Sequence, residues 1–238
     1  MCKVVDVFVN TQSFVKGSKK LMLFSVLFRY WKVKIYYLCT KSLVLNTHID
    51  ISVANESHAD YAQEIADMIE DAAEKRGTGI AKRKAAYIIE KMKKGMAIIA
   101  MDGREVAGFC YIESWGHGKY VANSGLIVNE NHRGIGLSKQ IKLKAFQMSR
   151  EQFPDAKLFG LTTSLPVMKI NSELGYRPVT FSELTDDEAF WKGCQSCVNY
   201  DILKRTNKKH CLCTGMLHDP EDKKNIKTAT TKNSKEGV

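Results

Sequence analysis

Apolar and polar positions follow regular periods from residue 49 onward. Alternation over 49–53 predicts a half-buried strand. Apolar residues at helical spacing then predict a helix with a capping box formed by Ser57 and Asp60, ending at Gly77. A second helix, over 81–94, is expected to follow.

The central part of the chain predicts a meander followed by a crossover helix. Three apolar runs read as strands, over 96–101, 105–113 and 120–128. Asp102-Gly103 is typical of a tight hairpin, so neighbouring strands should be antiparallel. A helix over 136–153 then leads to a strand over 157–163, which a right-handed crossover places parallel to the third strand.

The last third of this region predicts a short helix and two strands. Ser164 is expected to cap the helix, with Pro166 in its first turn, and Gly175 to end it. The strands are predicted over 177–181 and 198–203. The expected fold class is therefore α/β (α+β), with a mixed, mostly antiparallel central sheet flanked by helices. The predicted element order is β-α-α-β-β-β-α-β-α-β-β.

Composition and charge divide the chain into three parts. Of the 238 residues, 44% are hydrophobic, which is ordinary for a soluble globular protein. Residues 1–48 carry eight Lys or Arg against one acidic residue, and residues 221–238 carry five Lys against three acidic residues. Nearly all of the net charge of +10 therefore belongs to the ends. We expect a basic extension over 1–48, one domain over 49–220 and a disordered tail over 221–238.

The extension leaves three interpretations open: a surface-binding basic arm, a poorly ordered segment, or translated upstream sequence from a misassigned start. Its best apolar run, Leu21–Phe28, is short of the roughly 20 residues that span a membrane. No small-residue cleavage site follows this run, which disfavours a secretory signal. Seven cysteines without such a signal predict a reducing, cytoplasmic location.

Two closely spaced glycines stand where the third strand of the meander gives way to a helix, in the sequence RGIGLS at 133–138. A helix amino terminus attracts phosphate, and small residues let a ligand reach the backbone. Gly134 and Gly136 are therefore predicted to clear the approach for a pyrophosphate, although a purely structural role is equally compatible with the pattern. The expected amide donors are Ile135, Gly136, Leu137 and Ser138. A Rossmann unit is disfavoured because its glycine loop follows the first strand of a βαβ unit.

The loop and the element order together resemble the GNAT superfamily of N-acyltransferases, which use acyl-coenzyme A. The family signature is Gln or Arg, two residues, Gly, one residue, then Gly or Ala. Residues 133–138 match it, with Ser138 as another small residue at the last position. The sequence NSELGYRPV at 171–179 looks like the family's segment from its fourth helix into the next strand.

The resemblance implies a ternary complex in which an amine attacks the thioester of acetyl-CoA or another acyl-CoA directly. Leu126, Ile127 and Val128 align with the family's splayed strand, whose backbone pairs with the pantetheine arm and stabilises the oxyanion. Without the family they would be core β-residues. Arg133 could meet a phosphate, or be an exposed surface arginine.

The acid and base are harder to assign. Many family members place a proton-donating Tyr where this chain has Asn171, which can only hydrogen-bond. Asn171 could hydrogen-bond the pantetheine or the sulfur, while Tyr176, Tyr200 or water handles the proton or the thiolate leaves unprotonated. Glu113 and His117 are candidates for the base, and both are also compatible with solvated loop positions. Glu113, Asn171 and Tyr176 are the predicted catalytic residues.

Four cysteines near the carboxyl terminus permit a tetrahedral zinc site: Cys194, Cys197, Cys211 and Cys213. The second pair has the less typical CxC spacing, and a predicted strand intervenes. Redox pairing and ordinary reduced thiols are the alternatives, so no metal ligand is assigned.

The predicted function is transfer of an acyl group, expected to be acetyl, to the amine of a small molecule or amino acid. The sequence SELTDDEAFWKGCQSC resembles bacterial GNAT proteins associated with arginine biosynthesis, which suggests glutamate, with Arg177 or Lys192 holding its carboxylates. A non-catalytic GNAT-like module that binds acyl-CoA or a partner protein is the alternative. A zinc-stabilised nucleic-acid binder is disfavoured because the middle of the chain is nearly neutral. Homo-oligomerisation is left open.

Overall fold

The computed structural model describes residues 49–77 and 82–222. The chain divides into two units, Met1–His48 and Ile49–Val238, and the account below concerns the second. The interpretations of 1–48 and of the tail from residue 223 lie outside the described residues. No helix within the described ranges is long and apolar enough to cross a membrane.

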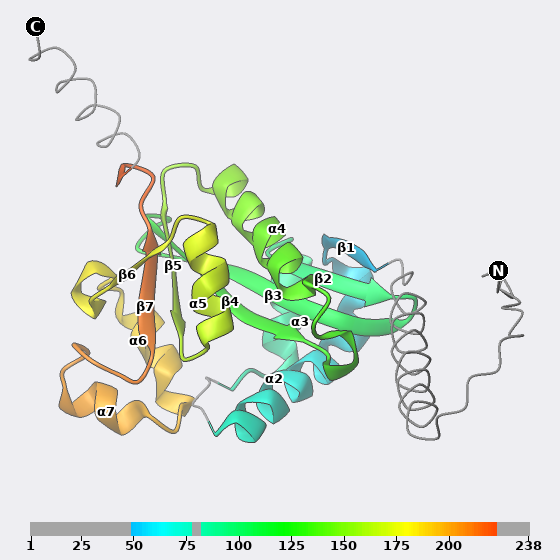
Figure 1. Ribbon diagram of the computed structural model, residues 1–238, viewed down its shortest axis with the longest axis horizontal. Helices are drawn as coiled ribbons and strands as arrows, with labels where there is room; N and C mark the ends of the chain where they lie inside the picture. Colours follow the sequence, from blue (N-terminus) through cyan, green and yellow to red (C-terminus); the bar gives the residue numbers. More distant parts are fainter. Residues whose placement is uncertain (1–48, 78–81, 223–238) are drawn as a thin grey trace, which may run out of the picture. The chain divides into compact units, whose positions relative to one another are not determined.

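A seven-stranded sheet forms the centre of the fold, in the order β1-β2-β3-β4-β5-β7-β6 (Figure 1). All neighbouring strands are antiparallel except β4 and β5, which are parallel as the crossover predicts. The mixed, mostly antiparallel sheet is thus confirmed. The strands are β1 (Asp50–Val53), β2 (Ala97–Asp102), β3 (Glu105–Trp115), β4 (Tyr120–Val128), β5 (Lys157–Thr162), β6 (Arg177–Val179) and β7 (Thr214–His218).

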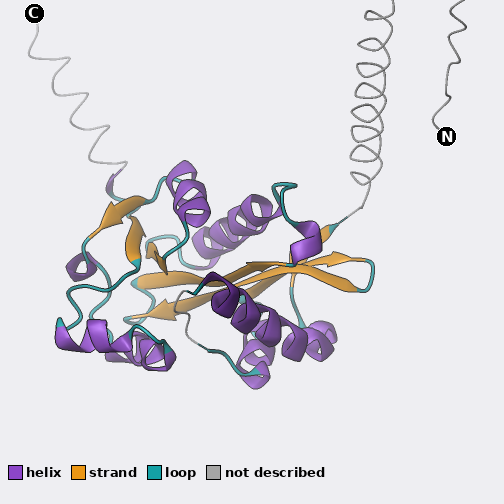
Figure 2. Cartoon of the chain, turned by 60° about the horizontal axis from the view of Figure 1, so that its bottom comes forward, coloured by secondary structure: helices purple, strands orange, loops and turns teal. Residues whose placement is uncertain are grey.

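Helices cover both faces of the sheet (Figure 2). Side chains that alternate along each strand explain this arrangement: Phe109 and Tyr111 of β3 pack with α2 and α3, whereas Cys110 and Ile112 face α4. A smaller cluster around Trp191 covers β5 and β7. The helices are α2 (Ala62–Arg76), α3 (Ala85–Lys93), α4 (Leu137–Gln152), α5 (Leu165–Glu173), α6 (Glu188–Lys192) and α7 (Tyr200–Arg205).

The first helical segment begins differently from the prediction. The capping residue is Asn55, whose Oδ1 accepts the Ser57 amide at 2.9 Å, while His58 Nδ1 accepts the Asn55 amide at 3.2 Å. The predicted box of Ser57 and Asp60 is therefore wrong, because the capping asparagine lies two residues earlier and starts a 3-10 helix (Glu56–Tyr61) before α2. Gly77 ends α2 in the left-handed conformation, as predicted.

The strand predicted over 198–203 is also wrong. Residues Tyr200–Arg205 form α7, in which Leu203 is buried while Val198, before the helix, is 79% exposed. The final strand is β7, which inserts between β5 and β6. Periodicity alone does not separate a short apolar run in a strand from one in a short helix.

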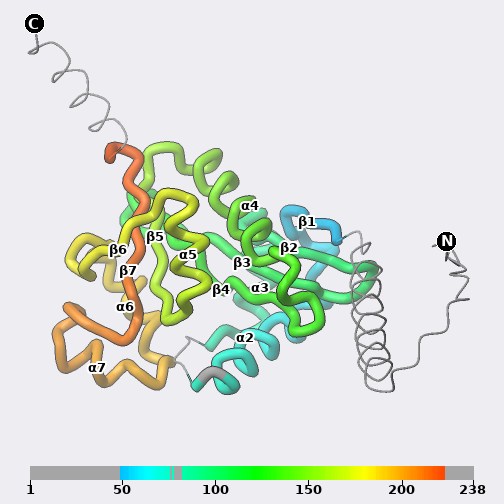
Figure 3. The backbone as a smooth tube through the Cα atoms, viewed as in Figure 1, coloured from blue at the N-terminus to red at the C-terminus, as the bar shows by residue number. Residues whose placement is uncertain are grey.

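β4 and β5 separate after three paired residues. Tyr120 to Ala122 pair with Lys157 to Phe159, and the pairing ends there although both strands continue (Figure 3). Beyond this point β4 carries a bulge in its pairing with β3, around Gly125, whose φ is +65°. A Cβ at Gly125 would lie 2.5 Å from the Tyr111 ring. The bulge and the separation leave one edge of β4 open to a ligand.

Candidate active site

A cavity of about 870 Å³ lies where β4 and β5 separate. One end is bounded by β4, β5 and α5, and includes Leu126 and Asn171. The other end is bounded by α3, β3 and the α6 region, and includes Glu113 and Lys192. We refer to the part bounded by α3, β3 and the α6 region, which has several titratable side chains, as the chamber.

The glycine loop lies at the amino terminus of α4. Gly134 and Gly136 both have φ of +81°, and a Cβ at either position would meet nothing within 4 Å. The glycines are thus required by backbone conformation, and they leave the approach to the helix start open. α4 begins without a side-chain cap or an acidic residue in its first turn. The earliest amides of the helix that bond back are those of Lys139 and Gln140, both to Gly136 O.

The other predicted coenzyme-binding residues lie on β4 and just before the loop. Leu126 lines the cavity, Ile127 is buried in the core, and Val128 pairs with Gly108 of β3. Arg133 is about half exposed, and its Nε donates to Val128 O at 3.2 Å. Its guanidinium also lies 3.5 Å from the Glu130 carboxylate. The loop itself, 133–138, is not part of the cavity lining.

Glu113 faces the cavity from β3 and is held by two donors. The Tyr87 hydroxyl and the Lys91 ammonium each lie 2.5 Å from a Glu113 oxygen. The side chains of Lys91 and Glu113 are only 7% and 18% exposed. Burial raises the pKa of Tyr87, so its proton stays on the phenol. The predicted base is thus a carboxyl group held in place at the cavity wall by two donors.

Arg83 is a cavity residue that sequence reasoning missed. Its Nε donates to the Tyr111 hydroxyl at 2.9 Å, and its Cζ lies 5.4 Å from the centroid of the Tyr87 ring. Tyr87 and Tyr111 meet edge to face with centroids 5.6 Å apart. Its Nη1 donates to Lys82 O at 3.1 Å, and Arg83 forms no ion pair within the described part of the chain, so its Nη2 remains available to an anion. The sequence offered only a basic run at 82–84, which is usually a solvated surface.

Asn171 lies on α5 at the other end of the cavity. It is 1% exposed, and its Oδ1 has no hydrogen-bond partner among the described residues. An unpaired buried acceptor costs free energy unless a ligand satisfies it. The position is consistent with the predicted hydrogen bond to a bound carrier.

Tyr176, the third predicted catalytic residue, lies outside the cavity lining. Its hydroxyl donates to Asn123 Oδ1 at 2.6 Å, in the core on the α4 face of the sheet. Burial raises its pKa. The Asn123 amide in turn donates to Ser149 Oγ at 2.8 Å. The phenol is thus committed to a buried network.

Replacing Tyr176 by phenylalanine is expected to lower the free energy of unfolding by about 1–3 kcal/mol, because Asn123 Oδ1 loses its donor. Urea denaturation measures this loss. We expect turnover to change little. A large fall in kcat with normal stability would contradict the structural role and support the predicted catalytic one.

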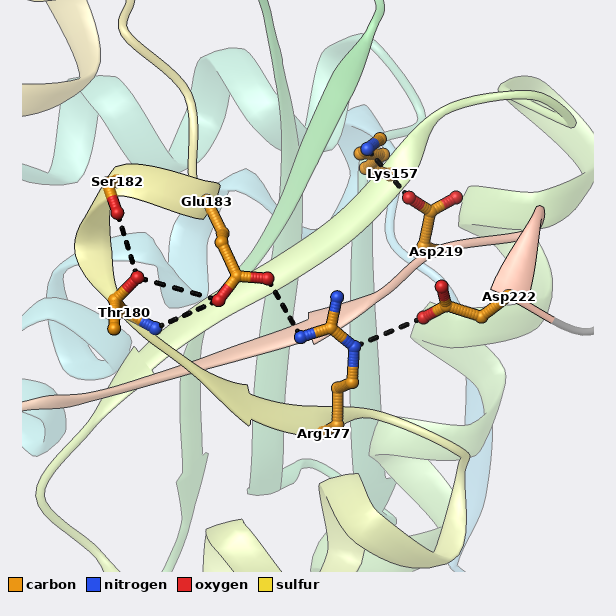
Figure 4. Close-up of polar contacts among 7 residues, drawn as sticks. All are labelled: Lys157, Arg177, Thr180, Ser182, Glu183, Asp219 and Asp222. Carbon is orange, nitrogen blue, oxygen red and sulfur yellow. Dashed lines mark hydrogen bonds and ion pairs between the residues drawn. The ribbon is translucent and has the colours of Figure 1, made fainter.

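Three further candidates lie away from the cavity. His117 is in the exposed loop between β3 and β4, and Tyr200 lies in α7. Arg177 donates to Glu183 at 2.9 Å and to Asp222 at 3.2 Å, and Figure 4 shows it held between the two carboxylates. Lys192, the alternative to Arg177 for binding a substrate carboxylate, does line the cavity.

The cysteines near the carboxyl terminus border the same chamber. Cys194, Cys197 and Cys213 are among the lining residues, and all are free thiols. Burial raises the pKa of Cys194 to about 11. Within the described ranges no three Cys, His, Asp or Glu side chains are arranged to hold a metal ion. Burial raises the pKa of Cys213, and the thiols of Cys194, Cys197 and Cys211 raise it further, so the four thiols do lie near one another and the zinc hypothesis stays open.

No protein-family model and no curated protein sequence matches the chain. Solved structures do match its fold. N-acetylglutamate synthase from Neisseria gonorrhoeae, complexed with coenzyme A and N-acetyl-glutamate, has a TM-score of 0.52 and 15% identity, over 72% of this chain and 35% of that one. A Mycobacterium tuberculosis protein solved in complex with CoA has a TM-score of 0.51 and 15% identity, over 71% of this chain and 98% of that one.

A putative acetyltransferase from Acinetobacter baylyi gives a TM-score of 0.51 and 15% identity, over 74% and 94% of the two chains. This chain spans about a third of the Neisseria enzyme's length. At this identity the matches establish the fold, and they confirm the fold that the glycine loop and element order indicated.

Proposed function

We propose that this chain, which has the fold of the GNAT acetyltransferases, is an acyl-CoA-dependent N-acyltransferase that acts on a small amine. The observation that carries the proposal is the cavity at the separation of β4 and β5, which joins an open strand edge to a chamber containing Glu113 and Arg83. A thioester entering along the strand edge would meet an amine held in the chamber.

The carrier would be held by backbone groups. The amides at the start of α4 have no acceptor among the described residues and could donate to a diphosphate, and the macrodipole favours negative charge there. The open edge of β4, from Asn123 to Val128, would pair with the pantetheine arm. Polar backbone groups at this edge would then stabilise the oxyanion of the tetrahedral intermediate.

Glu113 is proposed as the base. The attacking amine must lose a proton, and Glu113 is a carboxylate at the wall of the chamber, oriented by Tyr87 and Lys91. The amine nitrogen adds to the thioester carbonyl to give the tetrahedral intermediate, and collapse of this intermediate breaks the C–S bond and leaves the electron pair on sulfur. The products are an N-acyl amine and free coenzyme A.

The acceptor is proposed to carry a carboxylate. Arg83 offers a planar guanidinium with no ionic partner in the described part of the chain, and Lys192 lies in the same cavity. Glutamate, the substrate whose acetylated form is bound in the Neisseria structure, is therefore the first acceptor to test. Acetyl is the first acyl group to test.

Replacing Arg83 by methionine is expected to raise KM for a carboxylate-bearing acceptor about tenfold, since a hydrogen-bonded charge contributes about 1.5–3 kcal/mol. Initial rates at varied acceptor concentration measure this effect. The KM for acetyl-CoA should be unchanged, and an acceptor lacking the carboxylate should show no difference. An equal loss with both acceptors would contradict the role.

The non-catalytic module remains a second candidate, because Asn171 occupies the position at which the resemblance places a proton donor. Thiol release from acetyl-CoA and succinyl-CoA over a panel of amines, glutamate included, separates the two. Turnover on any amine establishes the enzyme. Coenzyme A binding without turnover would favour the module.

A further inference from the structure

Lys142 lies in the middle of α4 and is buried, with 2% of its surface exposed. It lines the cavity at the separation of β4 and β5. Its Nζ is 3.5 Å from Asn123 O and 5.6 Å from the centroid of the Tyr176 ring. No ion pair of Lys142 occurs within the described ranges. It is therefore a buried amine without a counter-charge, facing the cavity.

An amine in this position is costly. Removing it from water disfavours the ammonium form, and burial lowers the pKa of Lys142 below its ordinary 10.5. Apolar residues of α4 and the sheet pack on this face of the helix, next to the buried Asn123, so an aliphatic side chain would fill the space without that cost. Packing alone does not account for the amine.

The titratable groups around Lys142 do not compensate its charge. Cys110 of β3 is fully buried, and burial raises the pKa of its thiol to about 11. Burial also raises the pKa of Tyr176, which follows α5. Both are neutral at physiological pH, so neither compensates the ammonium, and a negative charge appearing in the cavity could pair with it.

Asn171 of α5 lines the same cavity, with its Oδ1 unpaired. α4 and α5 thus each present a buried polar group with unused hydrogen-bonding capacity where β4 and β5 separate. The carrier's sulfur would pass this point if its pantetheine arm pairs with β4, as proposed above. The sulfur is also the atom on which negative charge appears when the thioester is cleaved.

We propose that Lys142 contacts the sulfur of the acyl carrier and donates its ammonium proton to the thiolate as it leaves. The inference rests on the proposed function. The C–S electron pair goes to sulfur, a proton from Nζ converts the thiolate to the thiol, and Lys142 becomes a neutral amine. The proton lost by the acceptor nitrogen, carried by Glu113 or water, restores the ammonium, so atoms and charge balance.

The test compares the affinities of coenzyme A and desulfo-coenzyme A, which lacks the thiol, over a pH series by calorimetry. The wild-type protein should bind coenzyme A about tenfold more tightly in the pH range where the thiol and Lys142 together have lost one proton, because a charge-assisted hydrogen bond then shares the remaining proton between sulfur and Nζ. Lys142→Met should bind the two ligands equally, with unchanged affinity for the desulfo compound. Its kcat should fall about tenfold, since a thiolate leaves readily even unaided.

Lys144→Met is the matched control. Lys144 lies two residues along the same helix, and its ammonium donates to Ile51 O in β1, away from the cavity. This variant should retain the preference for coenzyme A. The inference is overturned if Lys142→Met still prefers coenzyme A over desulfo-coenzyme A. It is also overturned if the wild-type protein shows no such preference.

The outcomes also separate this inference from the proposed function. Preference for coenzyme A without turnover on any amine would leave the Lys142 contact standing and remove the catalytic proposal. Binding of neither ligand would remove both. If Lys142→Met turns over substrate at the wild-type rate and still prefers coenzyme A over desulfo-coenzyme A, only the role of Lys142 is contradicted.

A second measurement needs no ligand. In the pH range from the lowered pKa of Lys142 up to about 10.5, the folded state binds fewer protons than the unfolded state. The free energy of unfolding of the wild-type protein should therefore rise with pH in that range, relative to Lys142→Met. If the free energies of unfolding of the wild-type protein and Lys142→Met change with pH in the same way, the amine is not buried as the structure has it. That result would also contradict the inference.

Discussion

Replacing Gly134 by glutamate is expected to weaken coenzyme A binding at least about 100-fold. The glutamate would place a negative charge at the start of α4, where the free amides and the macrodipole favour an anion. Losing two charge-assisted hydrogen bonds, at about 1.5–3 kcal/mol each, accounts for a reduction of this size. Calorimetric titration of folded protein with coenzyme A measures it.

Gly103→Glu provides the control for strain and charge. Gly103 also has a positive φ, of +61°, and also has open space where a Cβ would lie, but it is in the β2–β3 hairpin. Both substitutions add one negative charge and force a side chain into the left-handed region, at about 1–2 kcal/mol. Only Gly134→Glu should affect coenzyme A. If the two variants bind coenzyme A with equal affinity, the proposed diphosphate site is wrong, and the acyl-transfer proposal that depends on it is wrong as well.

The glycine loop could be predicted because its physics is local. Two glycines between an apolar strand and an amphipathic helix specify a backbone conformation, and both adopt φ of +81°. The parallel placement of β5 followed from the crossover rule, which depends on element order alone. Features that depend on neighbours along the chain, such as a loop conformation or the placement of a crossover strand, can therefore be predicted from the sequence.

The chamber residues could not be predicted in the same way. Arg83 and Glu113 are 30 positions apart, and their proximity results from α3 packing on β3. Lys142 reads in the sequence as one of several basic residues on an amphipathic helix, and only its orientation toward the sheet buries it. Tyr176 shows the converse. It is a candidate proton donor in the sequence because Asn171 stands where many family members have a Tyr, whereas the fold commits its hydroxyl to Asn123.

Replacing Glu113 by glutamine is expected to lower kcat about 100-fold, the lower end of what a general base contributes. Glutamine keeps the size of the side chain but cannot accept the proton of the amine. It also leaves Lys91, 7% exposed, without its ionic partner, so stability should fall as well. Steady-state rates under saturating substrates, together with urea denaturation, measure the two effects separately.

The double variant Glu113→Gln, Lys91→Met distinguishes a base from a purely structural carboxylate. If Glu113 only compensates Lys91, removing both charges should restore stability and activity together, because no unpaired buried charge remains. If Glu113 is the base, stability should recover while kcat stays as low as in Glu113→Gln alone. The ion pair fixes the carboxylate at the chamber wall in either case, so recovery of kcat in the double variant is the result that would rule out proton transfer to Glu113.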